Sequence, residues 1–304
     1  MHHVEISGYR AGSGAKPQHL LLTLLGDYWY RREESISSTA LVDLLAEFDV
    51  SEPNARAAIS RLARRGLLQS LRRGRATRYR LTSQAAATLE EGTRRIFEFG
   101  HSPRPWDGTW TCLSFSIPES QRSTRTNLRT RLRWLGFAAL YDAVWFASGD
   151  RTAAAADLIA ELGIESATII AGPVHNAGEG DPLRAWDLDT LRSRYETFVG
   201  RFGPLREPAE HGRIAAAEAL VVRTALIDEW RVFPALDPEL PAELLPTAWP
   251  QKAAVDLFVT IYDSLGPPAT EHVGAVLARH DPEAARLATH HTTRIAFPDP
   301  GGSG

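Results

Sequence analysis

Arginine is concentrated in one short stretch of this sequence. Residues 51–80 contain nine arginines and a single acidic residue, Glu52. Guanidinium groups bind phosphate oxygens and the edges of guanine bases. A solvent-exposed surface without a partner usually carries charges of both signs, so this imbalance indicates contact with a polyanion.

The charge of the whole chain limits where that polyanion can bind. The 304 residues carry a formal net charge of −3, with 34 basic and 37 acidic side chains. Because residues 51–80 are so basic, the remaining sequence is acidic overall. We therefore expect only the N-terminal part to bind the polyanion, and its pattern favours double-stranded DNA as the partner.

Helical and strand periodicity indicates which elements carry these arginines. A mostly apolar segment over residues 19–29 predicts a first helix, and the spacing of apolar residues over 41–48 predicts a second. A third helix is expected within residues 51–66, where a glycine ends it. Alternation then predicts a β-hairpin with strands over 67–71 and 76–81. This order of elements is that of a winged helix-turn-helix.

We expect the third helix to enter the major groove and the hairpin to lie against the backbone or the minor groove. A groove-facing surface must lack bulky apolar side chains and must supply hydrogen-bond donors, and arginines at a hairpin tip suit phosphates. The expected DNA-binding residues are Arg56, Ser60, Arg61, Arg64, Arg72, Arg73, Arg75 and Arg78. Because one such module buries little surface, we expect a homodimer on an operator with two-fold symmetry.

The remaining sequence predicts further domains, so the fold class is an α+β multidomain protein. The expected domains are a disordered tail (1–17), a winged-helix domain with a linker helix (18–100), a middle domain (106–203) and a helical C-terminal domain (209–297). Strands and helices of the middle domain alternate in the order βαββαβ, which predicts a ferredoxin-like arrangement. In the C-terminal domain, separate helices are expected over residues 252–265 and 270–280.

The sequence contains no pattern typical of a catalytic site. Nucleophile motifs, phosphate-binding loops and zinc-protease helices do not occur in it. Its single cysteine, Cys112, excludes internal disulfides and thiolate-rich metal sites, and its position in a predicted strand is typical of a small buried residue. We therefore predict no enzyme, no cofactor and no metal.

Two groups of side chains leave metal chemistry open as an alternative. Histidines and acids lie close together near the C-terminus, although such histidines are usually surface residues; they are His280, Asp281, Glu283, His290 and His291. Asp142 and Asp150 flank a predicted strand of the middle domain, and a nucleic-acid-processing metal nuclease would need such acids to cluster. An architectural or RNA-binding protein that uses the same basic stretch is a third alternative.

Hydropathy excludes membrane-spanning segments. No apolar run approaches the ~20 residues that span a bilayer, and the first residues lack the pattern of a secretory signal. We expect a cytoplasmic protein with no membrane partner.

Five segments carry a resemblance to a known family. They are residues 22–28 (LTLLGDY), 54–62 (NARAAISRL), 72–82 (RRGRATRYRLT), 132–137 (LRWLGF) and 237–250 (DPELPAELLPTAWP). In this order and spacing they resemble the PaaX family, which are repressors of phenylacetic acid degradation. The resemblance extends over about residues 18–280. It implies the three domains above, with a middle domain similar to a small CRISPR-associated nuclease fold.

The resemblance also implies an operator-binding dimer that is released by an aryl-CoA thioester such as phenylacetyl-CoA. An aromatic head needs aromatic walls and a phosphate tail needs fixed positive charge. The expected effector-binding residues are Trp134, Trp145, Arg129, Arg131 and Arg133. The sequence departs from the family pattern at Ala138 and Ala139, where a glycine is expected, and at Gln251. The first departure lies in the expected effector-sensing half and leaves the identity of the effector open.

Overall fold

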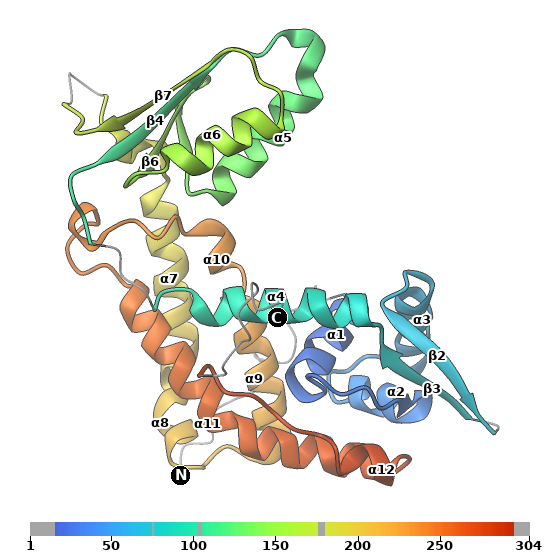
Figure 1. Cartoon of the computed structure of the whole chain (residues 1–304). Coiled ribbons are helices and arrows are strands. Elements are labelled where there is room, and N and C mark those ends of the chain that lie inside the picture. Colours follow the sequence, from blue (N-terminus) through green and yellow to red (C-terminus); the bar gives the residue numbers. More distant parts are fainter. Residues whose placement is uncertain (1–15, 75, 102–104, 176–179, 295–304) are drawn as a thin grey trace, which may run out of the picture. The chain divides into compact units, whose positions relative to one another are not determined.

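A computed structural model describes residues 16–74, 76–101, 105–175 and 180–294 (Figure 1). The chain forms two compact units. Unit 1 contains residues 1–99, 198–232 and 253–304, and unit 2 contains residues 100–197 and 233–252. The predicted tail over residues 1–17 lies outside the described residues except for its last two positions, and so does the hairpin residue Arg75.

The N-terminal part of unit 1 consists of three helices and a small antiparallel sheet. Its elements are α1 (Pro17–Tyr28), β1 (Ile36–Ser37), α2 (Ser38–Ala46), α3 (Glu52–Arg64), β2 (Leu68–Arg73) and β3 (Ala76–Leu81). The strands lie in the order β1-β3-β2, and the β2–β3 hairpin pairs from Leu68↔Leu81 to Arg73↔Ala76. The helices and the hairpin lie where the periodicity predicts them. Strand β1 has only two residues, which is too short for an alternating pattern to be recognised in the sequence.

Local chemistry explains where these helices begin and end. The Ser37 hydroxyl accepts a hydrogen bond from the Ala40 amide at 3.2 Å and caps the N-terminus of α2. Pro53 lies in the first turn of α3, where a missing N–H costs no hydrogen bond. Gly66 has a φ of 72°, a left-handed conformation that lets the chain turn from α3 into β2. The buried apolar faces of α1, α2 and α3 form the core of this part.

The rest of unit 1 is helical. It contains α4 (Ser83–Glu98), the last part of α7 (Leu188–Phe202), α8 (Arg206–Glu210), α9 (Ala216–Trp230), nearly all of α11 (Gln251–Ala278) and α12 (Pro282–Ala285). Every residue of α9 from Ala219 to Ile227 is buried. A helix that is buried on all sides lies at the centre of its unit, so α9 forms the core of this part.

The structure corrects the prediction of two separate helices over residues 252–265 and 270–280. A single helix, α11, runs from Gln251 to Ala278 and contains both Pro267 and Pro268. Two prolines remove two backbone hydrogen bonds and normally end a helix. Here the residues around them, Leu265 and Ala269, are fully buried, so tertiary packing holds the helix together across the prolines.

Unit 2 contains a four-stranded antiparallel sheet with helices against one face. Its first elements are β4 (Trp110–Phe115), α5 (Arg122–Trp134), β5 (Ala138–Tyr141), β6 (Val144–Ser148), α6 (Thr152–Glu161) and β7 (Ala167–Gly172). The strand order is β5-β6-β4-β7. Helices α5 and α6 lie on the same side of the sheet (Figure 1). This is the element order that the alternating pattern predicts.

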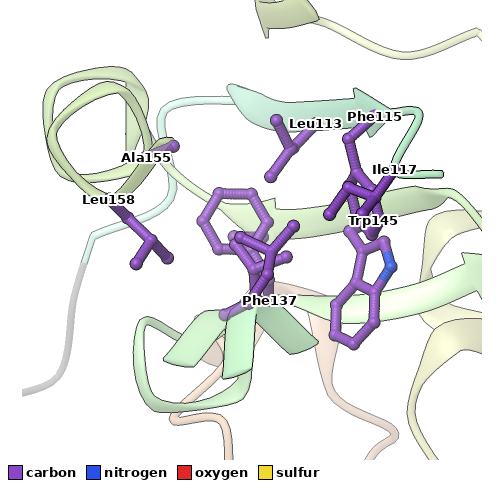
Figure 2. Packing of buried hydrophobic residues seen from close by; sticks show 10 residues of the cluster. Leu113, Phe115, Ile117, Phe137, Trp145, Ala155 and Leu158 are labelled. Atoms are coloured by element: carbon purple, nitrogen blue, oxygen red, sulfur yellow. The ribbon is translucent and has the colours of Figure 1, made fainter. Parts of the chain in front are cut away.

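The core of unit 2 lies between this sheet and the two helices. Figure 2 shows that side chains of alternate strand residues, such as Leu113 and Trp145, point toward Phe137 and the α6 residues Ala155 and Leu158. Alternation places neighbouring strand residues such as Trp110 and Phe146 on the opposite face. They are also buried there, and the rings of Trp106 and Trp186 pack against Trp110.

The segment over residues 237–250 is anchored through one partly buried carboxylate, that of Asp237. The Tyr195 hydroxyl donates to Asp237 Oδ2 at 2.6 Å, and Gln251 Nε2 donates to the same oxygen at 3.1 Å. The Tyr195 ring, on α7, stacks on Phe233 of α10 (Phe233–Leu236), with 4.3 Å between ring centroids. Gln251, where the family pattern has glycine, therefore contributes a hydrogen bond to the folded unit. Among the described residues, no helix combines the length and hydropathy that crossing a membrane requires.

Candidate nucleic-acid interface

One side of α3 presents polar and basic side chains to solvent. Arg56, Ser60, Arg61 and Arg64 are all exposed, whereas Ala55, Ala58, Ile59 and Leu62 are buried against the rest of unit 1. Arg56 Nε donates to Glu52 Oε1, one turn earlier, at 2.8 Å. Exposed pairs of this kind contribute little free energy, so a phosphate or a base can replace Glu52 as the partner.

The β2–β3 hairpin follows α3 and adds further cations. Arg72 and Arg73 are exposed on β2. Arg73 Nη1 donates to Glu283 Oε2 of α12 at 2.9 Å, with both side chains about 70% exposed. On β3, Arg80 Nε donates to Gln69 Oε1 across the hairpin at 2.8 Å.

Arg78, which the sequence predicts to bind DNA, does not belong to this exposed surface. Its side chain is only 14% exposed, and its Nη2 atom lies 2.9 Å from Oδ2 of the buried Asp281. Its Nε atom donates to Ser35 Oγ at 2.9 Å, and Nη2 also donates to the Ser35 carbonyl. Arg78 lies on β3, the central strand of its sheet. Ser35, just before β1, and Asp281, near the C-terminus, cover its side chain.

Three further polar residues lie on the same surface and were not among the predicted DNA-binding residues. Asn54 is exposed in the first turn of α3, and an asparagine amide can bind adenine with two hydrogen bonds. Arg65 is exposed at the C-terminus of α3, and Arg80 is partly exposed on β3. All three residues lie within the arginine-rich residues 51–80, and this position in the sequence could have identified them as candidates.

The structure does not assemble the predicted tryptophan walls of an effector pocket. Trp145 is 1% exposed and belongs to the core of unit 2 (Figure 2), whereas Trp134 is 61% exposed at the end of α5. The Arg133 guanidinium lies 5.5 Å from the Trp145 ring centroid. Trp145 faces inward because it is on a strand with alternating side chains, so its ring contacts the core of unit 2.

The other two predicted effector residues are engaged separately. Arg131 forms two hydrogen bonds of 2.6 Å with the carboxylate of Glu161 on α6. Arg129 Nη2 donates to the Asp142 carbonyl at 3.1 Å. Residues two positions apart on a helix are separated by about 200° around its axis, so these arginines do not converge on one point.

The residues considered for metal chemistry are also dispersed. Within the described residues, no group of three or more potential ligands is close enough to hold a metal ion. Asp150 accepts hydrogen bonds from the amide and hydroxyl of Thr152 at the start of α6, which lower its pKa. His280 lies 3.0 Å from Asp43 of α2. Cys112 is partly buried on β4, where burial raises the pKa of its thiol.

A buried polar cluster fixes α1 to the helices of unit 1. Arg223 of α9 is fully buried, and its Nη1 atom lies 3.4 Å from Asp27 Oδ2 of α1. Tyr262 of α11 donates to Asp27 Oδ1 at 2.9 Å, and its ring lies 3.7 Å from the Arg223 guanidinium carbon. Burial raises the pKa of Asp27, although Arg223 and Tyr262 oppose that shift.

His291 extends this cluster from the C-terminal segment. Its carbonyl accepts a hydrogen bond from Arg223 Nη2 at 2.9 Å. Burial, with a contribution from the positive charge of Arg223, lowers the pKa of His291 to about 3. His291 is therefore neutral and part of the core, which differs from the surface position that is usual for terminal histidines.

Three segments of the chain match family models of the same family. Residues 16–85 match the PaaX-like protein, residues 103–182 the PaaX protein central Cas2-like domain, and residues 186–275 the PaaX-like protein C-terminal domain. The Transcriptional repressor PaaX of Escherichia coli (strain K12) is 29% identical over 265 residues, which cover 84% of this chain and 82% of that protein.

A solved structure supports the fold. The uncharacterized protein Rv0674 from Mycobacterium tuberculosis superimposes with a TM-score of 0.56 at 20% identity, and the match covers 86% of this chain and 98% of that one. At this identity the likeness concerns the fold alone. The three family models and the curated relative, a transcriptional repressor, agree with one another, so this chain belongs to the PaaX family.

Proposed function

We propose that this protein is a transcriptional repressor that binds duplex DNA through a winged helix-turn-helix formed by α1, α2, α3 and the β2–β3 hairpin. The observation that carries the proposal is the composition of the exposed side of α3, where Arg56, Arg61 and Arg64 surround Ser60 without bulky apolar side chains. Such a surface suits a helix in the major groove, where arginines bind guanine and small polar residues permit close approach.

The two elements have different expected roles. The side chains of α3 read base edges, and Arg72, Arg73 and Arg75 of the hairpin bind phosphates or the minor groove. Arg78 is replaced in this assignment by Arg80, because Arg78 is held by Asp281. A repressor of this kind acts on DNA in the cytoplasm.

We further propose that a homodimer binds two half-sites about one helical turn apart, or a multiple of it. We assign a ferredoxin-like arrangement to β4–β7 and propose that the domain containing these strands binds the effector. As in the family resemblance, an aryl-CoA thioester is the proposed effector. Exposed Trp134 and the arginines Arg129 and Arg133, which lie one turn apart on α5, remain its proposed contacts, with Trp145 as the buried support beneath Arg133. Arg131 could join them only by leaving Glu161.

A mobility-shift experiment with the promoter DNA beside the gene tests DNA binding. We expect a retarded band with sequence preference, and a binding constant that falls steeply as salt is raised. Equal affinity for unrelated DNA of the same length would favour an architectural protein, and magnesium-dependent cleavage would favour a nuclease. Either result would contradict the repressor proposal.

The same experiment, repeated with ligands, tests release. We expect phenylacetyl-CoA to remove the retarded band and free phenylacetic acid to leave it unchanged. A tenfold loss of affinity requires about 1.4 kcal/mol of preference of the ligand for the state that does not bind DNA. If no thioester changes the band, the effector proposal fails and the DNA-binding proposal stands.

A further inference from the structure

Asp281 connects the C-terminal helices of unit 1 with the elements that carry the DNA-binding surface. The residue is 3% exposed and lies between α11 and α12. Its Oδ1 atom accepts from the Ala284 amide at 3.2 Å and caps α12. Its Oδ2 atom accepts from the Ser37 amide at 2.8 Å and lies 2.9 Å from Arg78 Nη2.

The two partners of Oδ2 are themselves positioned next to the proposed interface. Ser37 caps the N-terminus of α2, which packs against α3, and it pairs with Arg78 in the sheet. Arg78 pairs on its other side with Leu71 of β2. One buried carboxylate therefore fixes the hairpin and the start of α2 in one arrangement, although it does not itself face the exposed side of α3.

Glu283 lies two residues farther along and has a different environment. Its carboxylate is 70% exposed and forms an ion pair with Arg73 at the end of β2. Arg73 is one of the cations that the proposed function assigns to phosphate. A phosphate bound through two parallel N–H groups would compete with Glu283 for the donors of this guanidinium, and the two anions would repel each other.

We infer that these two acids affect DNA binding in opposite directions: Asp281 is a positioning residue that aligns the hairpin with α3, and Glu283 is a competitor of the DNA backbone for Arg73. The inference rests on the proposed function and deepens it. It assigns the C-terminal end of unit 1 a part in setting the affinity of the DNA-binding surface.

The opposite signs follow from burial and partners. Removal of any acid from a DNA-binding protein lowers its repulsion from phosphate, so charge alone predicts tighter binding in every case. Loss of the Asp281 carboxylate leaves Arg78 without its buried counter-charge. An asparagine also has a single acceptor oxygen where the carboxylate has two, one for the Ser37 amide and one for the Ala284 amide, so the hairpin loses its alignment. Loss of the Glu283 carboxylate frees Arg73 and leaves the buried contacts unchanged.

The test uses the full-length chain and three variants that each remove one negative charge. Asp281→Asn and Glu283→Gln address the two acids, and Glu271→Gln on the exposed side of α11 is the matched control. Binding to the promoter fragment that the wild-type protein shifts is measured by fluorescence anisotropy over a series of salt concentrations. Hydroxyl-radical footprints report which sugars the hairpin protects.

We expect Asp281→Asn to bind roughly tenfold more weakly than the wild type, with a salt dependence flatter by about one unit of slope for each lost phosphate contact. Protection should disappear at the hairpin positions and remain at those of α3. Glu283→Gln should bind about two- to fivefold more tightly, as expected for release from an exposed ion pair. The control should match the wild type within about twofold.

Asp281→Asn binding as tightly as the wild type, or more tightly, would overturn the positioning role. Glu283→Gln without any gain over Glu271→Gln would overturn the competition. Absence of DNA binding by the wild type contradicts the proposed function instead. If Asp281→Asn does not fold, Arg78→Lys preserves the net charge and removes the fork that joins Ser35 to Asp281; wild-type affinity and footprint in that variant would equally overturn the inference.

Discussion

Helices α3 and α5 are both rich in arginine, yet the structure gives their arginines different surroundings. On α5, Arg125 pairs with Glu119 at 2.9 Å, and Arg131 pairs with Glu161 through two hydrogen bonds. On α3, the described part of the chain supplies a partner acid for Arg56 but none for Arg61 or Arg64. The number of arginines is therefore a poor guide to a binding surface, and the supply of nearby acids is a better one.

Arg223 is the extreme case of a paired arginine. It is fully buried beside Asp27, and it also donates hydrogen bonds to two backbone carbonyls, those of Tyr262 and His291. The arginines compared here among the described residues differ in three ways: Arg223 is buried, Arg125 and Arg131 pair at the surface with an acid of another element, and the α3 arginines are exposed, with Arg56 paired to Glu52 one turn away on the same helix. Each environment predicts a different result of mutation.

The largest effect is expected for Arg223→Met. The substitution removes the charge and leaves Asp27 buried with no cation, which typically costs about 3–5 kcal/mol of unfolding free energy. Chemical denaturation measured by circular dichroism checks this value. A loss below about 1 kcal/mol would show that apolar packing can replace the ion pair between Arg223 and Asp27. Burial of an arginine would then not predict a large cost of mutation.

Acidification should destabilise the protein through the neighbour of Arg223, His291. Its folded pKa of about 3 lies below the usual value of 6.5, so the unfolded state binds a proton that the folded state cannot hold. The contribution of neutral His291 to the free energy of unfolding is therefore complete above pH 6.5 and is lost as the pH falls toward 3. At pH 4 the loss amounts to about 3 kcal/mol. Asp27, with its raised pKa, acts in the opposite direction over the carboxylate range.

Comparison with His291→Gln isolates the histidine contribution. Unfolding free energies of the two proteins should converge as the pH falls from 7 to 4, because only the wild type has the histidine to protonate. Parallel pH profiles would contradict a neutral, buried His291.

Arg56→Ala on α3 should weaken operator binding by about 1–3 kcal/mol and relax the preference for one base pair. Its exposed pair with Glu52 contributes little to folding, so thermal stability should change only slightly. Binding measured against a set of single-base operator variants checks the prediction. An equal loss for every sequence would mean that Arg56 binds phosphate.

The smallest effect is expected for Arg131→Ala on α5. Because Glu161 already satisfies this guanidinium, operator affinity should remain within about twofold of the wild type. The same anisotropy assay as for Arg56→Ala gives a direct comparison. A loss as large as that of Arg56→Ala would show that both helices bind DNA and would end the distinction between them.

The sequence also predicted some elements better than others. The period of 3.6 over α3 and the period of two over β2 and β3 are local properties, and both matched the structure. The break at Pro267 and Pro268 did not occur, because buried neighbours in α11 compensate for the lost hydrogen bonds. Local pattern gives an element its type, whereas packing decides whether a disfavoured residue is tolerated within it.

The basic character of residues 51–80, the elements that carry their arginines and the resemblance to a family can all be read from the sequence. The partner of each arginine cannot, because it depends on how the chain folds in three dimensions. Arg73 and Glu283 are 210 positions apart, and Ser37 and Asp281 are 244 positions apart. Hydrogen bonds and ion pairs act over a few ångströms in space, and the separation of residues along the chain carries no information about that distance. For this reason the pattern that identified the basic surface could not separate Arg78, which is bound to Asp281, from the arginines exposed beside it.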